Sequence, residues 1–284
     1  MNRVAAVVVN YNARDYLVDC VHSLRAAGVE HLVVADNASS DGSVDALRAA
    51  DPEVTVVETG GSLGYGANVN RGAAVVPAEV DVLVISNADV TVDPGAIKAL
   101  VDALDADPAL GIVGPRIDNT DGTVYPSARI VPRTVDAAGH AFFGLVKPTN
   151  RFTRRYRMLD WDHSVARRVD WVSGACFAIR RSLFEELRGF NENYFMYLED
   201  IDLCHRAGAT GAAVGYDPSA HVVHVGAVST KQLPYRMLAE HHRSVLRWWW
   251  TSHRWPVRVL VPFVVLGLGV RFVLSSVVRW LRHE

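Results

Sequence analysis

The chain has 284 residues, half of them hydrophobic, and a formal net charge of −2. This length exceeds the usual single-domain size and predicts one large domain or one domain with an extension. Residues 1–128 carry 7 Lys and Arg against 18 Asp and Glu, whereas residues 129–168 carry 9 against 3 and residues 231–284 carry 9 against 2. A basic middle and tail favours contact with phosphates or an anionic membrane surface. No recognised nucleic-acid motif accompanies this charge, which argues against nucleic acid as a partner.

The first half of the chain alternates apolar runs with helical periodicity. Strands are predicted over residues 3–10, 32–35, 54–58, 80–86 and 111–115, and helices over residues 14–27, 43–50, 64–76 and 94–106. This alternation predicts an α/β fold with a mostly parallel, doubly wound sheet.

Periodicity fades from about residue 118 to residue 168, where Pro, Gly, aromatic residues and arginines are mixed. This segment is interpreted as mobile or surface-docking, because long loops in compact domains are usually functional. Strand and helix signals then return over residues 169–179, 182–187, 200–209 and 220–225. The chain is therefore divided into a domain over residues 1–230 and C-terminal amphipathic or apolar helices over residues 231–284.

The C-terminal region contains twelve mostly apolar residues, 259–270, followed by Arg271. A spanning helix needs about 20 such residues, so this run is short for a span. With Trp248, Trp249, Trp250 and Arg258 nearby, a helix lying in the membrane interface fits better. The alternative is an amphipathic helix buried against the body or a partner subunit.

The three cysteines, Cys20, Cys176 and Cys204, are odd in number and far apart in sequence. They form neither a disulfide framework nor a zinc motif, and they fit a reducing cytoplasm. Polar residues from Asn10 onward interrupt the N-terminus before the apolar core of a signal peptide could form. A cytoplasmic protein that touches the membrane is therefore expected.

Polar side chains follow three of the predicted strands at the point where each strand ends. They are Asn10 and Asn12, Asp36 and Asn37, and Asn87 and Asp89. Open α/β sheets bind ligands at the carboxyl ends of their strands, so these groups suit a nucleotide crevice. A carboxylate beside an amide suits a Mg²⁺-type ion shared with substrate phosphates. The alternative is that these residues only begin turns, as Asn and Asp often do.

A glycine-rich turn, which includes Gly64 and Asn68, leads into the predicted helix over residues 64–76. Backbone N–H groups at such a helix start could meet a phosphate. The turn does not follow the first strand and lacks the dinucleotide-binding pattern, so the signal is weak alone.

Glu199, Asp200 and Asp202 lie close together at a predicted helix start. One carboxylate at a cleft edge can act as a general base towards a substrate hydroxyl, although acidic residues also simply cap helices. His221 and His224 alternate along a strand and therefore cannot easily ligate one ion together. His224 is the better candidate to complete a shell begun by Asp89, although a lone histidine in a strand is more often structural.

Five motifs occur in a fixed order between residue 4 and about residue 230. They are Val8-Val9-Asn10-Tyr11-Asn12, Ala35-Asp36-Asn37-x-Ser39-x-Asp41-Gly42-Ser43, Gly64-Tyr65-Gly66-x-Asn68, Asn87-Ala88-Asp89 and Glu199-Asp200-x-Asp202-Leu203. This series resembles the family 2 glycosyltransferases of GT-A fold. Residues 121–129 and 171–176 resemble the rhamnosyltransferases within that family. The resemblance implies a Rossmann-like nucleotide-binding mixed sheet flanked by helices, followed here by membrane-associating C-terminal helices.

The resemblance also implies roles for single residues. Asp36 would bind the base or ribose of the donor, with Asn10 and Asn12 nearby. Asp89 would hold Mg²⁺ or Mn²⁺ against the donor diphosphate, with His224 as a further ligand. Asp200 would deprotonate the acceptor hydroxyl. The remaining members support these groups or the donor: Asn37, Gly64, Asn68, Asn87, Glu199 and Asp202. Many family members carry Asp where this chain has Asn87, which weakens the first arm of the metal site.

The implied activity is an inverting, metal-dependent transfer of L-rhamnose from dTDP-L-rhamnose to a polyprenyl-diphosphate-linked GlcNAc in cell-wall synthesis. The enzyme would act at the cytoplasmic face of the plasma membrane. There Arg129, Arg133 and the arginines of residues 151–168 would meet the acceptor diphosphate or lipid headgroups. A homo-oligomer is left open.

Three alternatives stay beside this activity. The chain could transfer a different nucleotide sugar in cell-surface polysaccharide synthesis. It could be a nucleotidyltransferase, although that class would more naturally show a glycine-rich basic loop after the first strand. It could also be a membrane-tethered sugar-nucleotide binder without activity, which would need no Asp200.

Overall fold

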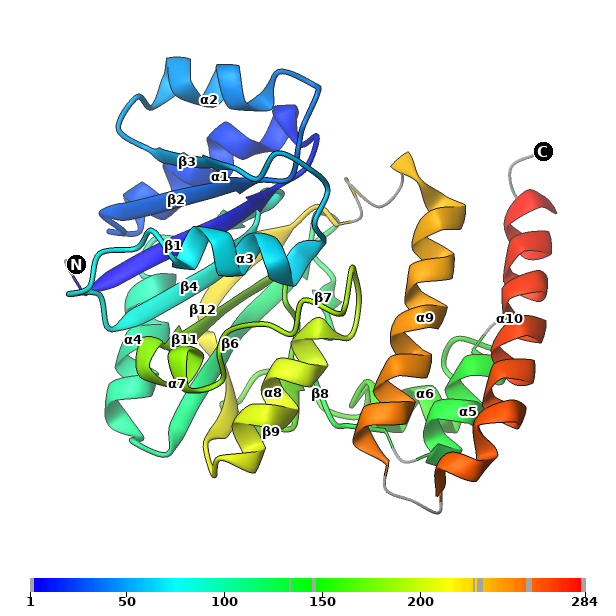
Figure 1. The fold of residues 1–284 in the computed structure, drawn as a ribbon. Helices are drawn as coiled ribbons and strands as arrows, with labels where there is room; N and C mark the ends of the chain where they lie inside the picture. Colours follow the sequence, from blue (N-terminus) through cyan, green and yellow to red (C-terminus); the bar gives the residue numbers. More distant parts are fainter. Residues whose placement is uncertain are drawn as a thin grey trace.

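The computed structural model describes residues 3–132, 134–144, 147–226, 228, 232–253 and 257–281, with the backbone alone for residues 278–281. Its centre is a ten-stranded sheet with helices on both faces (Figure 1). Along the main path the strands are β3 (Thr55–Glu58), β2 (His31–Asp36), β1 (Val4–Asn10), β4 (Val82–Asn87), β11 (Cys176–Arg180), β6 (Leu110–Asn119), β12 (Ala213–His224) and β5 (Val90–Val92).

Alternate side chains of the central strands enter two separate hydrophobic cores. Along β1, Val4 and Val8 face one core and Ala5 and Val7 face the other, as the two-residue period of a strand requires. The first core is covered by α1 (Arg14–Ala26), α2 (Ser43–Ala50) and α4 (Ala96–Ala106). The second core is covered by α3 (Tyr65–Ala73), α7 (Arg181–Glu186) and α8 (Glu199–Ala209).

The strands β3, β2, β1 and β4 are parallel, so their carboxyl ends meet at one edge of the sheet. The prediction of a mostly parallel sheet is wrong for the other half. There β11 runs antiparallel to both β4 and β6, and the sheet is mixed. The predicted strand over residues 169–179 is three pieces, because a turn at Ser173–Ala175 separates β9 (Arg167–Val169) and β10 (Trp171–Val172) from β11.

The segment over residues 118–168 is more regular than predicted. It contains β7 (Val124–Tyr125), β8 (Ala128–Arg129), α5 (Thr134–Phe143) and α6 (Arg151–Tyr156). The helices α5 and α6 pack together where Gly139 leaves room for the ring of Phe152, which a Cβ atom would meet at 2.3 Å. Arg133 lies outside the described residues.

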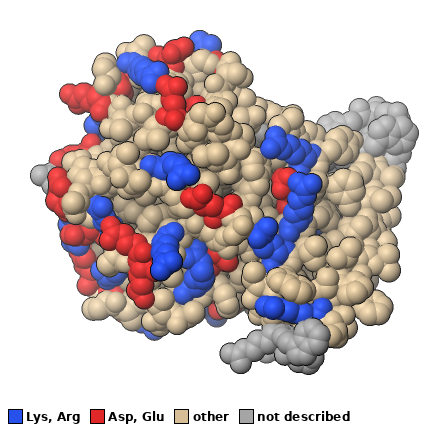
Figure 2. Space-filling view, viewed as in Figure 1, with Lys and Arg blue, Asp and Glu red and all other residues tan. Residues whose placement is uncertain are grey.

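The C-terminal helices α9 (Pro234–Ser252) and α10 (Val261–Leu281) stand beside the sheet domain, next to α5 and α6 (Figure 1). The contact of α9 with the domain includes a hydrogen bond from the Ser244 hydroxyl to the carbonyl of Met196 (2.9 Å). The stretch Val257–Val277 is by length and composition able to cross a membrane, so the apolar helix is longer than the twelve-residue run predicted. Its surface shows almost no charged side chains in Figure 2.

Candidate active site

The first group of polar residues lies at the ends of β1 and β2. The Asn10 amide is completely buried and donates to Asp36 Oδ1 (2.8 Å) and to the hydroxyls of Ser39 and Ser43. The second oxygen of Asp36 accepts the backbone N–H of Ser39 (3.0 Å). Asn10 is therefore a positioning residue, which holds the Asp36 carboxylate in one orientation at the strand ends.

The neighbouring Asn12 and Asn37 shape the loops around this carboxylate. Asn12 adopts a left-handed backbone conformation (φ 48°), and its side-chain oxygen accepts the N–H of Ser40 at 2.8 Å. The side chain of Asn37 accepts the N–H of Leu63 and lines the cavity described below. Of these two residues predicted to bind the sugar-nucleotide donor, Asn37 is thus the one that lines the cavity.

Gly64 and Asn68 build the turn that brings α3 against the later half of the chain. At Gly64 the backbone has φ +91°, and a Cβ atom would meet the carbonyl oxygen of Phe195 at 2.4 Å, so only glycine fits. The Asn68 amide donates to the Gly64 carbonyl (2.5 Å) and is fully buried. Asn68 therefore stabilises the turn from inside and does not reach the cavity.

The end of β4 and the end of β12 meet at Asn87, Asp89 and His224. His224 Nε2 lies 3.1 Å from Asp89 Oδ1 and 3.2 Å from the amide nitrogen of Asn87. The other oxygen of Asp89 accepts the N–H of Gly226 at 3.1 Å. The structure therefore brings together the three side chains predicted for the metal site. Among the described residues no group of three His, Cys, Asp or Glu side chains could hold an ion, and Asn87 stands where a third would be needed.

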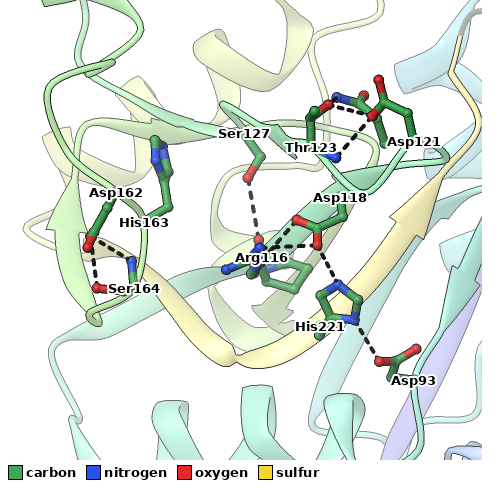
Figure 3. A network of polar contacts seen from close by, with 12 residues as sticks. Asp93, Arg116, Asp118, Asp121, Thr123, Ser127, Asp162, His163, Ser164 and His221 are labelled. Atoms are coloured by element: carbon green, nitrogen blue, oxygen red, sulfur yellow. Dashed lines mark hydrogen bonds and ion pairs between the residues drawn. The ribbon is translucent and has the colours of Figure 1, made fainter.

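His221 lies three residues earlier on β12 and faces away from this group. Its ring nitrogens lie 2.6 Å from Asp93 Oδ2 and 3.1 Å from Asp118 Oδ2, and Arg116 pairs with the same Asp118 (Figure 3). The two carboxylates raise the pKa of His221 against the opposing effect of burial. His221 is thus part of a separate ion-pair network, as the alternation of a strand predicts.

Glu199 and Asp200 begin α8. Asp200 Oδ2 accepts the N–H of Gly174 (3.0 Å), and Oδ1 accepts the N–H of Ile201 (2.8 Å). Burial raises the pKa of Asp200, opposed by these two hydrogen bonds and by the charge of Arg129. Burial and the charge of Asp200 raise the pKa of Glu199 well above its usual range, and Glu199 Oε2 has no hydrogen-bond partner. The two carboxyl groups therefore titrate as a pair, and burial favours the neutral form of Glu199 most strongly.

The turn Ser173–Ala175 joins the metal-site candidates to Asp200. The carbonyl of Ala175 accepts the N–H of Asn87 (2.9 Å), while the N–H of Gly174 binds Asp200. The Tyr65 hydroxyl donates to the Gly174 carbonyl (2.6 Å). Burial raises the pKa of Tyr65, and the nearby charges of Glu199, Asp200 and Asp89 raise it further. The end of β4 and the start of α8 are therefore fixed to one short turn.

Asp202 points elsewhere, although it lies only two residues after Asp200. Its carboxylate pairs with Arg206 (2.7 Å), which also donates to the carbonyls of Leu187 and Gly189. This arrangement ties α8 to the end of α7 and gives Asp202 a structural contact in place of a direct position at the site.

A cavity of about 120 Å³ opens beside the metal-site candidates. Its walls combine the strand ends with α3, α9 and the loop before α8: they include Tyr11, Asn37, Ser62, Tyr65, Asn87, Asp89, Phe195, Met196 and Arg236. Sequence reasoning missed Tyr65 and Arg236. Arg236 lies on α9, and its guanidinium stacks on the Phe195 ring at 4.8 Å. No local pattern announces that contact, because it arises only when α9 packs on the sheet domain.

A strand-end crevice in a mixed sheet flanked by helices is typical of GT-A-like folds, and comparison with known proteins identifies the class as glycosyltransferase. Residues 5–188 match the model of glycosyl transferase family 2, and the chain belongs to that family. It is 39% identical over 271 residues to an N-acetylglucosaminyl-diphospho-decaprenol L-rhamnosyltransferase from Mycobacterium tuberculosis, covering 89% of this chain and 88% of that protein. It is 24% identical to the rhamnosyltransferase WbbL of Escherichia coli, over 86% of this chain and 92% of the other. The resemblance seen in the motifs is confirmed.

Solved structures agree on the fold. A mannosyltransferase from Pyrobaculum calidifontis, in complex with GDP-Man and Mn²⁺, superposes with a TM-score of 0.60 at 17% identity, covering 97% of this chain and 75% of that one. The glycosyltransferase GalNAc-T7, with UDP, GalNAc and Mn²⁺, gives a TM-score of 0.56 at 18% identity, covering 78% and 42%. The predicted GT-A-like mixed sheet is confirmed.

Proposed function

We propose that this glycosyltransferase moves L-rhamnose from dTDP-L-rhamnose to a polyprenyl-diphosphate-linked GlcNAc, in one inverting displacement that requires Mg²⁺ or Mn²⁺. The observation that carries the proposal is the turn Ser173–Ala175, which holds the end of β4 and Asp200 together. The sugar and the acceptor rest on the 39% identity to the mycobacterial enzyme of that name.

The residues at the end of β4 fit a divalent ion. His224 Nε2 and Asp89 Oδ1 already point at each other over 3.1 Å, and a half-turn of the Asn87 amide would place its oxygen beside them. One carboxylate, one imidazole and one amide suit an ion that takes its other ligands from substrate phosphates. When bound, such an ion stabilises the negative charge that develops on the departing diphosphate.

The remaining steps belong to the side chains of the chain itself. Asp36, at the end of β2, and Asn37, in the loop after it, bind the nucleoside. The carboxylate of Asp36 accepts hydrogen bonds, and the amide of Asn37 can also donate them. Asp200 takes the proton of the acceptor hydroxyl while that oxygen bonds to the anomeric carbon. The bond from that carbon to the nucleoside diphosphate breaks at the same time, so the configuration inverts.

The protein acts in this proposal at the cytoplasmic face of the plasma membrane, where α10 associates with the bilayer. Ten large apolar side chains between Val257 and Val277 are more than a third exposed, among them Phe263 (71%) and Leu266 (67%). A lipid-linked acceptor explains this exposed apolar surface, because the protein and its substrate would then associate with the same membrane.

The test is a transfer assay with a short polyprenyl-diphosphate GlcNAc acceptor and a panel of nucleotide sugars, each with and without EDTA. The proposal expects product from dTDP-L-rhamnose and its loss when EDTA is added. Product from a different nucleotide sugar alone would contradict the sugar assignment, and transfer that EDTA leaves unchanged would contradict the metal.

A further inference from the structure

Cations without acidic partners gather between α5–α6 and α9–α10. Within the described residues, no ion pair involves Arg129, Arg157 or Arg271, in contrast to the neighbouring Arg154 and Arg155, which pair with Asp160 and Asp136. Arg157 Nε is buried and has no hydrogen-bond partner. Arg271 Nε donates to the carbonyl of Ala141 (3.0 Å), which leaves its charge without a counter-ion. An unpaired buried charge is costly, so the region suits an anion that is absent from the protein itself.

Two histidines border the same region. Burial and the charges of Arg157 and Arg271 lower the pKa of His140 to about 4. Burial, Arg271 and the adjacent histidines lower the pKa of His241 to about 3, and His241 Nδ1 is buried without a hydrogen-bond partner. Both rings are therefore neutral, and His241 keeps a hydrogen-bonding group free.

Arg271, His140 and His241 line a cavity of about 170 Å³ that is separate from the one at Asp89, and the charge of Arg157 acts on His140 in its wall. Its walls include His140, Tyr156, Leu198, Ile201, His241 and Arg271. Leu198 and Ile201 flank Glu199 and Asp200 in sequence, so the cavity reaches the start of α8. Arg129 connects the two places, because its charge acts on Asp200 and its guanidinium lies 3.5 Å from the Tyr156 hydroxyl.

Apolar surface lies beside the cavity, because exposed rings on α5 follow its lining residue Ala141. Phe142 and Phe143 on α5 are 41% and 58% exposed, and Phe142 lies against Gly267 of α10. Residues next to Asp200, the cation Arg271 and residues of the apolar helices α5 and α10 thus meet at one cavity. A lipid-linked sugar offers the matching groups: a hydroxyl, a diphosphate and a hydrocarbon chain.

We propose that this second cavity binds the diphosphate of the lipid-linked acceptor through Arg271 in its wall and Arg157 beside it, with the isoprenoid chain along Phe142 and α10. Guanidinium groups bind phosphate oxygens through charge-assisted hydrogen bonds, which are about twice as strong as neutral ones. The identity of the acceptor rests on the proposed function, whereas the site rests on the unpaired cations alone.

The test measures binding of farnesyl diphosphate by calorimetry in EDTA, which keeps the metal-dependent donor site from contributing. We expect Arg157→Gln and Arg271→Gln each to weaken binding roughly tenfold or more. The matched control is Arg154→Gln, three residues before Arg157, whose side chain is exposed and paired with Asp160, and it should bind as the wild type does. Arg157→Lys keeps the charge and should retain most of the affinity, which separates charge from folding.

Three ligands separate the sources of the anion. Inorganic pyrophosphate should compete with farnesyl diphosphate, and farnesol should bind equally to all variants. Binding to phosphatidylglycerol vesicles should be unchanged in Arg157→Gln. Equal affinity of all variants for farnesyl diphosphate would overturn the site, and so would a loss of vesicle binding in its place. Wild-type protein that binds farnesyl diphosphate but transfers no sugar would overturn the proposed function and leave the site standing.

Discussion

The ends of β1 and β2 and the region between α5 and α9 are both polar and buried, yet their side chains are paired in opposite ways. At the strand ends the side-chain nitrogen of Asn10 donates to Asp36 and Ser43 at 2.8 Å, although Asn10 Oδ1 is buried without a partner. Between α5 and α9, Arg157 and His241 each keep a buried nitrogen without a partner. A carboxylate held by hydrogen bonds, as Asp36 is, has its position fixed before any ligand arrives, whereas unpaired cations are completed by a ligand. In the proposed function the nucleotide side is therefore preorganised, and the acceptor side is completed by its substrate.

The strongest way to separate the two sides is Asp200→Asn. We expect transfer to fall by roughly a thousandfold, because loss of a general base costs on the order of 10²–10⁴ in rate. Donor affinity should be unchanged, since Asp200 does not line the cavity beside Asp89. Steady-state kinetics and donor titration measure both. Asp202→Asn is the matched control: its ion pair with Arg206 predicts lower stability with near-normal transfer, and transfer lost equally in both variants would contradict the assignment.

Asp89→Asn tests the candidate metal site on the donor side. Removing the single carboxylate of the candidate metal site should lower transfer by roughly a hundredfold and raise the metal concentration needed for half-maximal rate. Asp93→Asn serves as its control, because Asp93 lies just beyond β5 and binds His221 in the separate network. Normal metal dependence in Asp89→Asn would exclude the residue as a ligand.

Asn10→Ala tests preorganisation through stability. It strands the Asp36 carboxylate and the hydroxyl of Ser43, and should lower the free energy of unfolding by about 2 kcal/mol. Asn12→Ala should cost less, because Asn12 makes its contacts near the surface. Denaturant unfolding compares the two variants, and an equal loss would show that the buried network adds nothing special.

Glu199→Gln should have the smallest effect, and it should raise the free energy of unfolding where Asn10→Ala lowers it. The pKa of Glu199 is raised by folding, so the stability linked to its proton is complete below its ordinary pKa of 4.5 and is lost as the pH rises through the raised value. Glutamine cannot lose that proton. The variant should therefore be more stable than the wild type by about 1 kcal/mol at pH 8, with the difference shrinking towards pH 4. Melting temperatures over this pH range measure it, and a gain that does not depend on pH would contradict the buried proton.

The strand ends could be predicted from sequence, because apolar runs and the polar residues after them are local signals. Asp36, Asn87 and Asp89 lie at one edge of the sheet because β2, β1 and β4 are parallel, as predicted for this half. Strand direction is not local, so the antiparallel β11 and the turn at Gly174 could not be foreseen. The different roles of the neighbouring carboxylates were also not evident from the sequence. Two residues along a helix are about 200° apart, so Asp200 and Asp202 face different surroundings. Arg236 and Arg271 acquire their positions only from the packing of α9 and α10.

In the proposed reaction one base, Asp200, and a donor held at the end of β4 meet in a single displacement. The most direct test is the anomeric configuration of the product, determined by NMR after transfer from dTDP-L-rhamnose to the polyprenyl-diphosphate GlcNAc acceptor. A single displacement gives a product whose anomeric configuration is opposite to that of the sugar in the donor. A product that retains the donor configuration would exclude this mechanism.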